Sequence, residues 1–309
     1  SDSSNSGHPL RFSTTSDGSH GGGSEFTTNV TTTGTPGNAG AKTVITLGSG
    51  VATLYYYCTQ HSAMGGQANT NSSFGSSNFS GSIQSTVSAS NDAGFSIATW
   101  TGTGSNGSVG HGLGGVDFMI IKDRDNNRNW YTWNKTFAYN DRIKLDTTDA
   151  KETGTDNMTA LPDSTKINMA TSTQNNGSSI NYVGYFLQEK KGYSKIGSYT
   201  GNGNSDGPFC FTGFRPSFIL GRRTDSAGGW WLSDNKRSNG FNLNDEYVVA
   251  DSSNAEADDG SFASDFLSNG WKARATNGNF NASGGSYIYM AFAESPFVNS
   301  AGAVPTNAR

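Results

Sequence analysis

The sequence predicts an all-β protein on three observations. Short runs of β-branched and aromatic residues recur along the chain, bounded by Gly, Asn, Asp or Ser, as in strands that end in turns. No window of 11 residues carries a sustained helical stripe, and the 41 Gly would interrupt a helix while serving positive-φ turns. The predicted strands are Thr43–Leu47, Thr53–Cys58, Phe95–Trp100, Asp117–Lys122, Tyr182–Leu187, Pro216–Leu220, Tyr247–Ala250 and Ser286–Phe292.

Composition and charge exclude several classes of protein. With 21 Lys and Arg against 25 Asp and Glu, the net charge is −4, which argues against a nucleic-acid binder. No apolar run is long enough to insert into a membrane. The 18 Phe, 12 Tyr and 6 Trp supply buried area that a disordered chain lacks. We therefore expect a folded protein of extracellular or virion type.

The second part of the chain repeats itself. The segment Trp100–Gly104 recurs as Tyr199–Gly203, and Tyr182–Glu189 recurs as Tyr287–Glu294. The offset drifts from about 100 to 105, as small loop insertions would cause. Residues 94–191 and 192–297 are thus predicted to be two copies of one β-sandwich of lectin or jelly-roll type.

The remaining segments have distinct compositions. Residues 1–70 are expected to form a separate domain. Residues 71–93, rich in Ser, Asn and Gly, are predicted to be a flexible linker. Residues 298–309 are predicted to be a loosely held C-terminal tail.

The N-terminal domain carries one chemically specific motif. Cys58, His61 and Met64 offer a thiolate, an imidazole and a thioether at three-residue steps after a predicted strand. Soft sulfur donors beside imidazole favour copper over hard cations. A further ligand is expected from His8, which lies 50 residues upstream at the start of another strand. His20 is the second candidate, in a Gly-rich loop.

This Cys-x2-His-x2-Met pattern resembles the blue-copper loop of the cupredoxins, in the short form found in amicyanin. The resemblance implies a cupredoxin-like β-sandwich with Cys58, His61 and His8 as equatorial copper ligands and Met64 as the weak axial ligand. The sequence begins seven residues before His8, so this domain is expected to be truncated at its N-terminus. The alternatives are a metal-free buried Cys58 or a disulfide between Cys58 and Cys210.

Adjacent aromatic residues recur at matched positions of the two copies. Trp130 and Tyr131 correspond to Trp230 and Trp231, and all four are candidate platforms for sugar rings. A duplicated fold must fill the same interior twice, so core positions are the favoured interpretation. Strand alternation would leave one residue of each pair facing outward.

No catalytic motif stands out. His111 is flanked by glycines, with Phe211 at the matching position of the second copy, and it lacks a neighbouring nucleophile and acid in the sequence. We therefore predict a non-enzymatic protein.

The whole chain also resembles tail-fibre and other virion structural proteins of marine tailed phages. The resemblance is carried by His-Pro-Leu-Arg-Phe-Ser at 8–13, Leu-Tyr-Tyr-Tyr-Cys at 54–58 and Tyr-Ile-Tyr-Met-Ala-Phe-Ala-Glu at 287–294. It implies a homo-oligomeric component of the bacteriophage virion, for example a trimer. Its partners would be other virion proteins and a host cell-surface glycan or protein in host recognition. The alternative function is a copper-binding electron-transfer protein carried on β domains.

Overall fold

The computed structural model describes residues 5–46, 53–68, 75–238 and 242–294, together with the backbone of 297–298 and 305–306. The chain forms two compact units, Ser1–Phe74 (the N-terminal unit) and Gly75–Arg309 (the repeat unit). Both are built from antiparallel sheets, which confirms the all-β prediction. The only helix among the described residues is the single turn α1 (Gly278–Asn281), which is far too short to cross a membrane.

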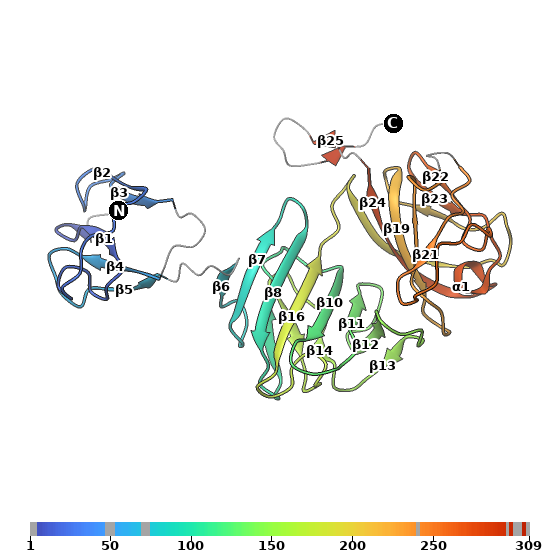
Figure 1. Cartoon of the computed structure of the whole chain (residues 1–309), viewed down its shortest axis with the longest axis horizontal. Coiled ribbons are helices and arrows are strands. Elements are labelled where there is room, and N and C mark those ends of the chain that lie inside the picture. Colours follow the sequence, from blue (N-terminus) through green and yellow to red (C-terminus); the bar gives the residue numbers. More distant parts are fainter. Residues whose placement is uncertain are drawn as a thin grey trace. The chain divides into compact units, whose positions relative to one another are not determined.

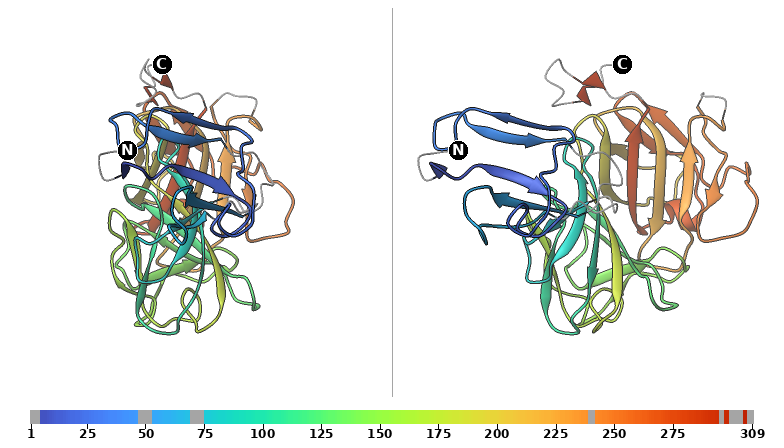
Figure 2. Two further views of the ribbon diagram at one scale, coloured as in Figure 1. Left: turned by 90° about the vertical axis from the view of Figure 1, so that its left-hand side faces the viewer. Right: turned by 60° about the vertical axis from the view of Figure 1, so that its left-hand side comes forward.

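The N-terminal unit contains one three-stranded sheet and one two-stranded ribbon. The sheet has the order β1 (Leu10–Ser13), β4 (Leu54–Cys58), β5 (Gly65–Ala68), and the ribbon pairs β2 (Val30–Thr33) with β3 (Lys42–Ile45). The ribbon runs alongside the sheet (Figure 2), and the Thr43 hydroxyl donates to the Leu10 carbonyl at 3.0 Å. Its assignment to the cupredoxin fold remains a prediction.

In the repeat unit, the first repeat consists of a large and a small sheet, and the central strands of the large sheet lie side by side in Figure 1. The large sheet has the order β13 (Glu152–Thr153), β12 (Asp141–Lys144), β11 (Tyr131–Asn134), β10 (Phe118–Asp123), β16 (Asn181–Leu187), β8 (Phe95–Thr101), β7 (Ser85–Ser90), β6 (Ser76–Asn78). The small sheet has the order β14 (Met158–Ala160), β15 (Lys166–Met169), β9 (Gly107–Gly110).

The second repeat has the same core topology. Its larger sheet has the order β17 (Ser194–Thr200), β24 (Ser286–Ala293), β19 (Pro216–Arg223), β20 (Trp231–Asp234), β21 (Val248–Val249). Its smaller sheet has the order β18 (Phe209–Phe211), β23 (Gly270–Ala273), β22 (Ser264–Leu267). A further short pair joins β25 (Phe297–Val298) to β26 (Pro305–Thr306).

Strand register is also repeated. Phe118 lies opposite Leu187 across β10 and β16, and Phe218 lies opposite Phe292 across β19 and β24. The same holds for hydrogen bonds: the Tyr182 hydroxyl donates to the Thr173 carbonyl, and its counterpart Tyr287 donates to Gly278. The two repeats therefore share one backbone design, down to individual polar contacts.

The two repeats pack against each other through sheet faces. Trp230, Ile288 and Met290 of the second repeat join the same hydrophobic cluster as Phe118 and Ile143 of the first. A separate cluster, centred on Trp231, Trp271 and Phe280, fills the second sandwich itself. The larger sheet of the second repeat is thus apolar on both faces.

The linker prediction for residues 71–93 is wrong where the structure describes them. β6 and β7 lie within this range, and β7 pairs with β8 from Thr86 opposite Thr99 to Ser90 opposite Phe95. Ile83 and Val87 are buried, and Thr86 and Val87 are β-branched residues that suit a strand. Residues 71–74, and all of the predicted tail 298–309 except the strand backbone, lie outside the described residues.

Candidate metal centre

Three of the four predicted metal ligands come together at one end of the N-terminal sheet. β1 and β4 are antiparallel with Leu10 opposite Cys58, and the Thr59 N–H donates to the Pro9 carbonyl at 3.1 Å. This register brings His8, which precedes β1, beside Cys58, which ends β4. His61 reaches the same point because the chain turns back after Cys58 towards β5.

The donor atoms surround one point. The Cys58 Sγ lies 3.7 Å from Nδ1 of His8 and 3.6 Å from Nδ1 of His61, and the ring centroids of the two histidines are 4.7 Å apart. All three ligand atoms lie within 4.8 Å of one another. Metal bonds of about 2.0 Å to nitrogen and about 2.3 Å to sulfur, at trigonal angles, place nitrogen and sulfur about 3.7 Å apart. The spacing fits a shared ion.

The three ligands of the cluster differ in exposure. Cys58 is 4% exposed, His8 is half-buried and His61 is exposed. The Gln60 N–H points at the Cys58 sulfur at 3.4 Å. An ion in this position would be held by a sheltered sulfur and reached from the His61 side.

Met64 lies at the rim of the cluster. Its backbone carbonyl accepts the Cys58 N–H at 2.8 Å, which closes the loop that carries the ligands. Its side chain is 47% exposed. The role of Met64 as an axial ligand remains a prediction.

A second loop braces the ligand loop, and sequence reasoning missed it. Both carboxylate oxygens of Asp17 accept the Ala63 N–H at 2.9 Å, and the His20 Nε2 lies 3.1 Å from the Cys58 carbonyl. Gly18 packs so closely on the Tyr57 ring that a β-carbon there would meet it at 2.4 Å. His20 thus contacts the backbone of Cys58, whereas His8 contacts its sulfur. The Ser-Asp-Gly turn at 16–18 was the available signal for this loop.

Comparison with known families matches residues 64–296 to a domain of unknown function. The chain belongs to the DUF7483 family. No curated protein and no solved structure matches the chain. The DUF7483 region takes in both repeats and starts at Met64, so His8, Cys58 and His61 all precede it.

Within the DUF7483 region, three of the four aromatic residues offered as sugar platforms are buried. Tyr131 and Trp231 have no exposed surface and Trp230 is 1% exposed, so the candidate role as sugar platforms is wrong for them and the favoured core interpretation is confirmed. The alternation argument failed at Trp230 because the outward face of its sheet is covered by the first repeat. Trp130 is partly exposed and stacks on Tyr185, with ring centroids 6.4 Å apart.

His111 and Cys210, two further residues of the DUF7483 region considered in the sequence analysis, have structural surroundings. The His111 Nδ1 accepts the Leu113 N–H at 3.1 Å, and its Nε2 lies 3.2 Å from the Asp163 carbonyl. Burial lowers the pKa of His111 and favours the neutral ring. Cys210 and Cys58 are both free thiols, so the alternative disulfide is not formed. Burial raises the pKa of Cys210 to about 12, which leaves it unreactive.

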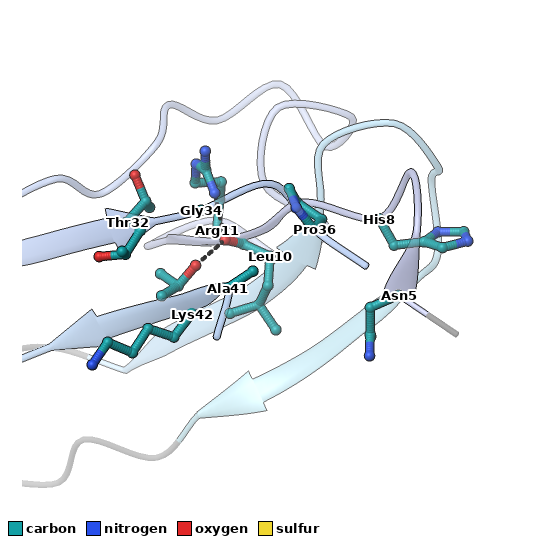
Figure 3. Close-up of a pocket in the computed structure, with 11 residues that line it drawn as sticks. Asn5, His8, Leu10, Arg11, Thr32, Gly34, Pro36, Ala41 and Lys42 are labelled. Atoms are coloured by element: carbon teal, nitrogen blue, oxygen red, sulfur yellow. Dashed lines mark hydrogen bonds between the residues drawn. The ribbon is translucent and has the colours of Figure 1, made fainter. Parts of the chain in front are cut away.

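A hollow of about 340 Å³ lies between β1 and the β2–β3 ribbon of the N-terminal unit (Figure 3). Leu10, Arg11, Lys42 and Thr43 line it. His8 also lines the hollow, although its ring points away from these residues in Figure 3, so the hollow adjoins the metal cluster.

Proposed function

We propose that the N-terminal unit binds a copper ion through Cys58, His8 and His61. The observation that carries the proposal is the placement of two imidazole nitrogens at 3.6 and 3.7 Å from one buried thiol sulfur. Two histidines and one cysteine in trigonal array are the donor set of electron-transfer copper sites. Copper bound there would supply one-electron redox chemistry.

The chain's own residues would do three things for the ion. Burial of Cys58 keeps water from the sulfur, and the Gln60 N–H stabilises its negative charge. Asp17 and His20 hold the ligand loop in position through Ala63 and the Cys58 carbonyl. Such preorganisation favours binding because little ordering remains to be done when the ion arrives.

The test is to load the full chain with Cu(II) and measure metal content and the visible absorption spectrum. We expect one copper per chain and a strong thiolate-to-copper charge-transfer band, both lost in Cys58→Ser. The matched control is Cys210→Ala, which removes the other free thiol and should leave copper binding intact. Absence of bound copper, or unchanged binding in Cys58→Ser, would overturn the proposal.

As a second function, we propose that the repeat unit is the rigid body of a non-enzymatic virion structural protein, such as a tail fibre or surface projection. Its support is the shared hydrophobic cluster that joins the two repeats into one block, together with the resemblance to phage virion proteins. In this role the chain would be a homo-oligomer, such as a trimer, that contacts other virion proteins and a host-surface glycan or protein.

Electron microscopy of intact particles, with antibody labelling of this chain, tests the second function. We expect the label on a projecting part of the particle, and purified chain that sediments as an oligomer. A chain that is monomeric and absent from particles would contradict it.

A further inference from the structure

Two polar hollows lie at equivalent positions of the two repeats. One, of about 220 Å³, is lined by Thr99, Thr101, Arg124 and Asn181 of the first repeat. The other, of about 540 Å³, is lined by the counterparts Ser198, Thr200, Thr224 and Ser286 of the second. In both, the strand pair places two of these residues directly opposite each other, Thr101 with Asn181 and Thr200 with Ser286.

The hollow of the second repeat is the larger because its surroundings differ. In the first repeat, β7 lies beside β8, and Thr86 of β7 and Gln84, which precedes β7, contribute to the wall. In the second repeat, β17 ends the described sheet and has no such neighbour. Thr136, Phe137 and Lys151 of the first repeat form the far wall instead. The hollow therefore opens at the junction of two repeats, a common place for ligand sites, and has the volume of one.

The lining combines free hydroxyl groups with an apolar floor. Ser198, Thr200 and Ser286 are exposed, and their side chains make no hydrogen bond among the described residues. The buried side chains of Phe137 and Ile288 lie next to them. Hydroxyls both donate and accept, and an apolar wall suits the C–H face of a sugar ring.

The charged residues of this hollow already have partners. Lys151 is paired with Asp141, and Asp225 is paired with Arg223 at 2.9 Å and accepts the Ser286 N–H at 3.2 Å. A charged ligand would find no unpaired countercharge there. In contrast, Arg124 in the smaller hollow has no ion-pair partner among the described residues.

We propose that the hollow formed by Ser198, Thr200 and Ser286 with Phe137 binds a neutral saccharide. Each free hydroxyl hydrogen-bonds a sugar hydroxyl, and the apolar floor packs on the ring. The proposal deepens the adhesive part of the proposed function by naming its site and ligand class. It is tested by binding in solution, whereas the virion role is tested by location, so failure of one is distinguishable from failure of the other.

The experiment screens the full chain on an array of neutral oligosaccharides of glucose, galactose, mannose and N-acetylglucosamine, with acidic polysaccharides alongside. Binding of the best neutral sugar is then measured by calorimetry. Filling the hollow with Ser286→Trp should weaken binding at least tenfold, and Ser88→Trp, at an exposed serine of β7 outside both hollows, should leave it unchanged. Thr200→Val removes one hydroxyl at constant shape and should also weaken binding. It provides the test if Ser286→Trp does not fold.

Three outcomes would overturn the proposal. The first is that no neutral sugar binds. The second is that binding persists at full strength in folded Ser286→Trp and in Thr200→Val. The third is that only acidic sugars bind and Arg124→Ala abolishes their binding, because the ligand then belongs to the smaller hollow.

Discussion

The two repeats share strand order, register and internal hydrogen bonds, but they differ in what covers the same sheet face. In the second repeat, Arg222 lies over the Trp230 ring at 5.3 Å, and both are buried. In the first, Lys122 lies over Trp130 at 5.8 Å, and both remain partly exposed. Both repeats therefore contain the cation–aromatic pair, but only the pair of the second repeat is buried, because the first repeat packs on it.

The buried pair is also tied to the first repeat by hydrogen bonds. The Trp230 indole N–H donates to the Lys144 carbonyl at 3.0 Å. The Arg222 guanidinium donates to the carbonyls of Lys144, Thr147 and Asp149. Burial lowers the pKa of Arg222 to about 10, so it stays protonated at neutral pH and keeps these bonds.

The largest expected effect comes from removing this tryptophan. Trp230→Ala should lower the free energy of unfolding by about 3–5 kcal/mol, because it leaves a cavity between the repeats. Trp130→Ala at the equivalent position should cost about 1 kcal/mol or less, because that ring is partly exposed. Urea unfolding followed by circular dichroism measures both. Equal losses would mean that the two repeats do not pack face to face in solution.

An intermediate effect is expected where the repeats are alike. The Asn281 amide donates to the carbonyls of Ala275 and Asn204 at 2.9 and 2.8 Å, and the Asn176 amide donates to those of Ala170 and Ser105 at 2.8 and 2.6 Å. Both asparagines are fully buried. Each Asn→Ala variant should cost about 2–3 kcal/mol, since buried carbonyls lose their donors.

The two asparagine variants serve as controls for each other. Their losses in unfolding free energy, measured in the same urea titrations, should agree within about 1 kcal/mol, because each substitution removes the donors of two equivalent carbonyls. A much larger loss in one repeat would show that the structure around equivalent contacts differs in stability between the two repeats.

Much of the fold follows from local pattern. All eight runs predicted as strands contain strands, because apolar alternation and flanking turn residues are local signals. β6 and β7 escaped notice because their residues are mostly Ser, Thr and Asn, and their apolar residues are few. What places them in the sheet is pairing with β8, which composition does not reveal.

The metal cluster was predictable for a different reason. His8 and Cys58 lie at the ends of two strands that pair, so their proximity follows once that pairing is assumed. The contacts of Asp17 and His20 join residues 46 and 38 apart through loops, where no periodicity applies. Likewise, the burial of Trp230 depends on packing between two repeats, which no property of either repeat encodes alone.

The smallest expected effect is a pH dependence of stability that arises in the first repeat alone. Buried His111 has a lowered pKa in the first repeat. By strand register its counterpart in the second repeat is Thr212, which does not titrate, and not Phe211 as the sequence comparison predicted. The unfolded chain takes up a proton at this histidine near its ordinary pKa of 6.5, whereas the folded chain resists it. The stability that His111 contributes is therefore complete above about pH 6.5. It is lost as the pH falls from there towards the lower pKa of the folded state.

We expect the Tm of the wild-type chain to fall more between pH 7.5 and 5.5 than that of His111→Gln, by roughly 2–4 °C. The matched control is Phe211→His. Phe211, the neighbour of Thr212, is 62% exposed, so a histidine there lies in solvent. Folded and unfolded chains then bind protons alike, and the variant should add no pH dependence. If Phe211→His steepened the fall as much as His111 does, burial would not be the cause of the pH dependence.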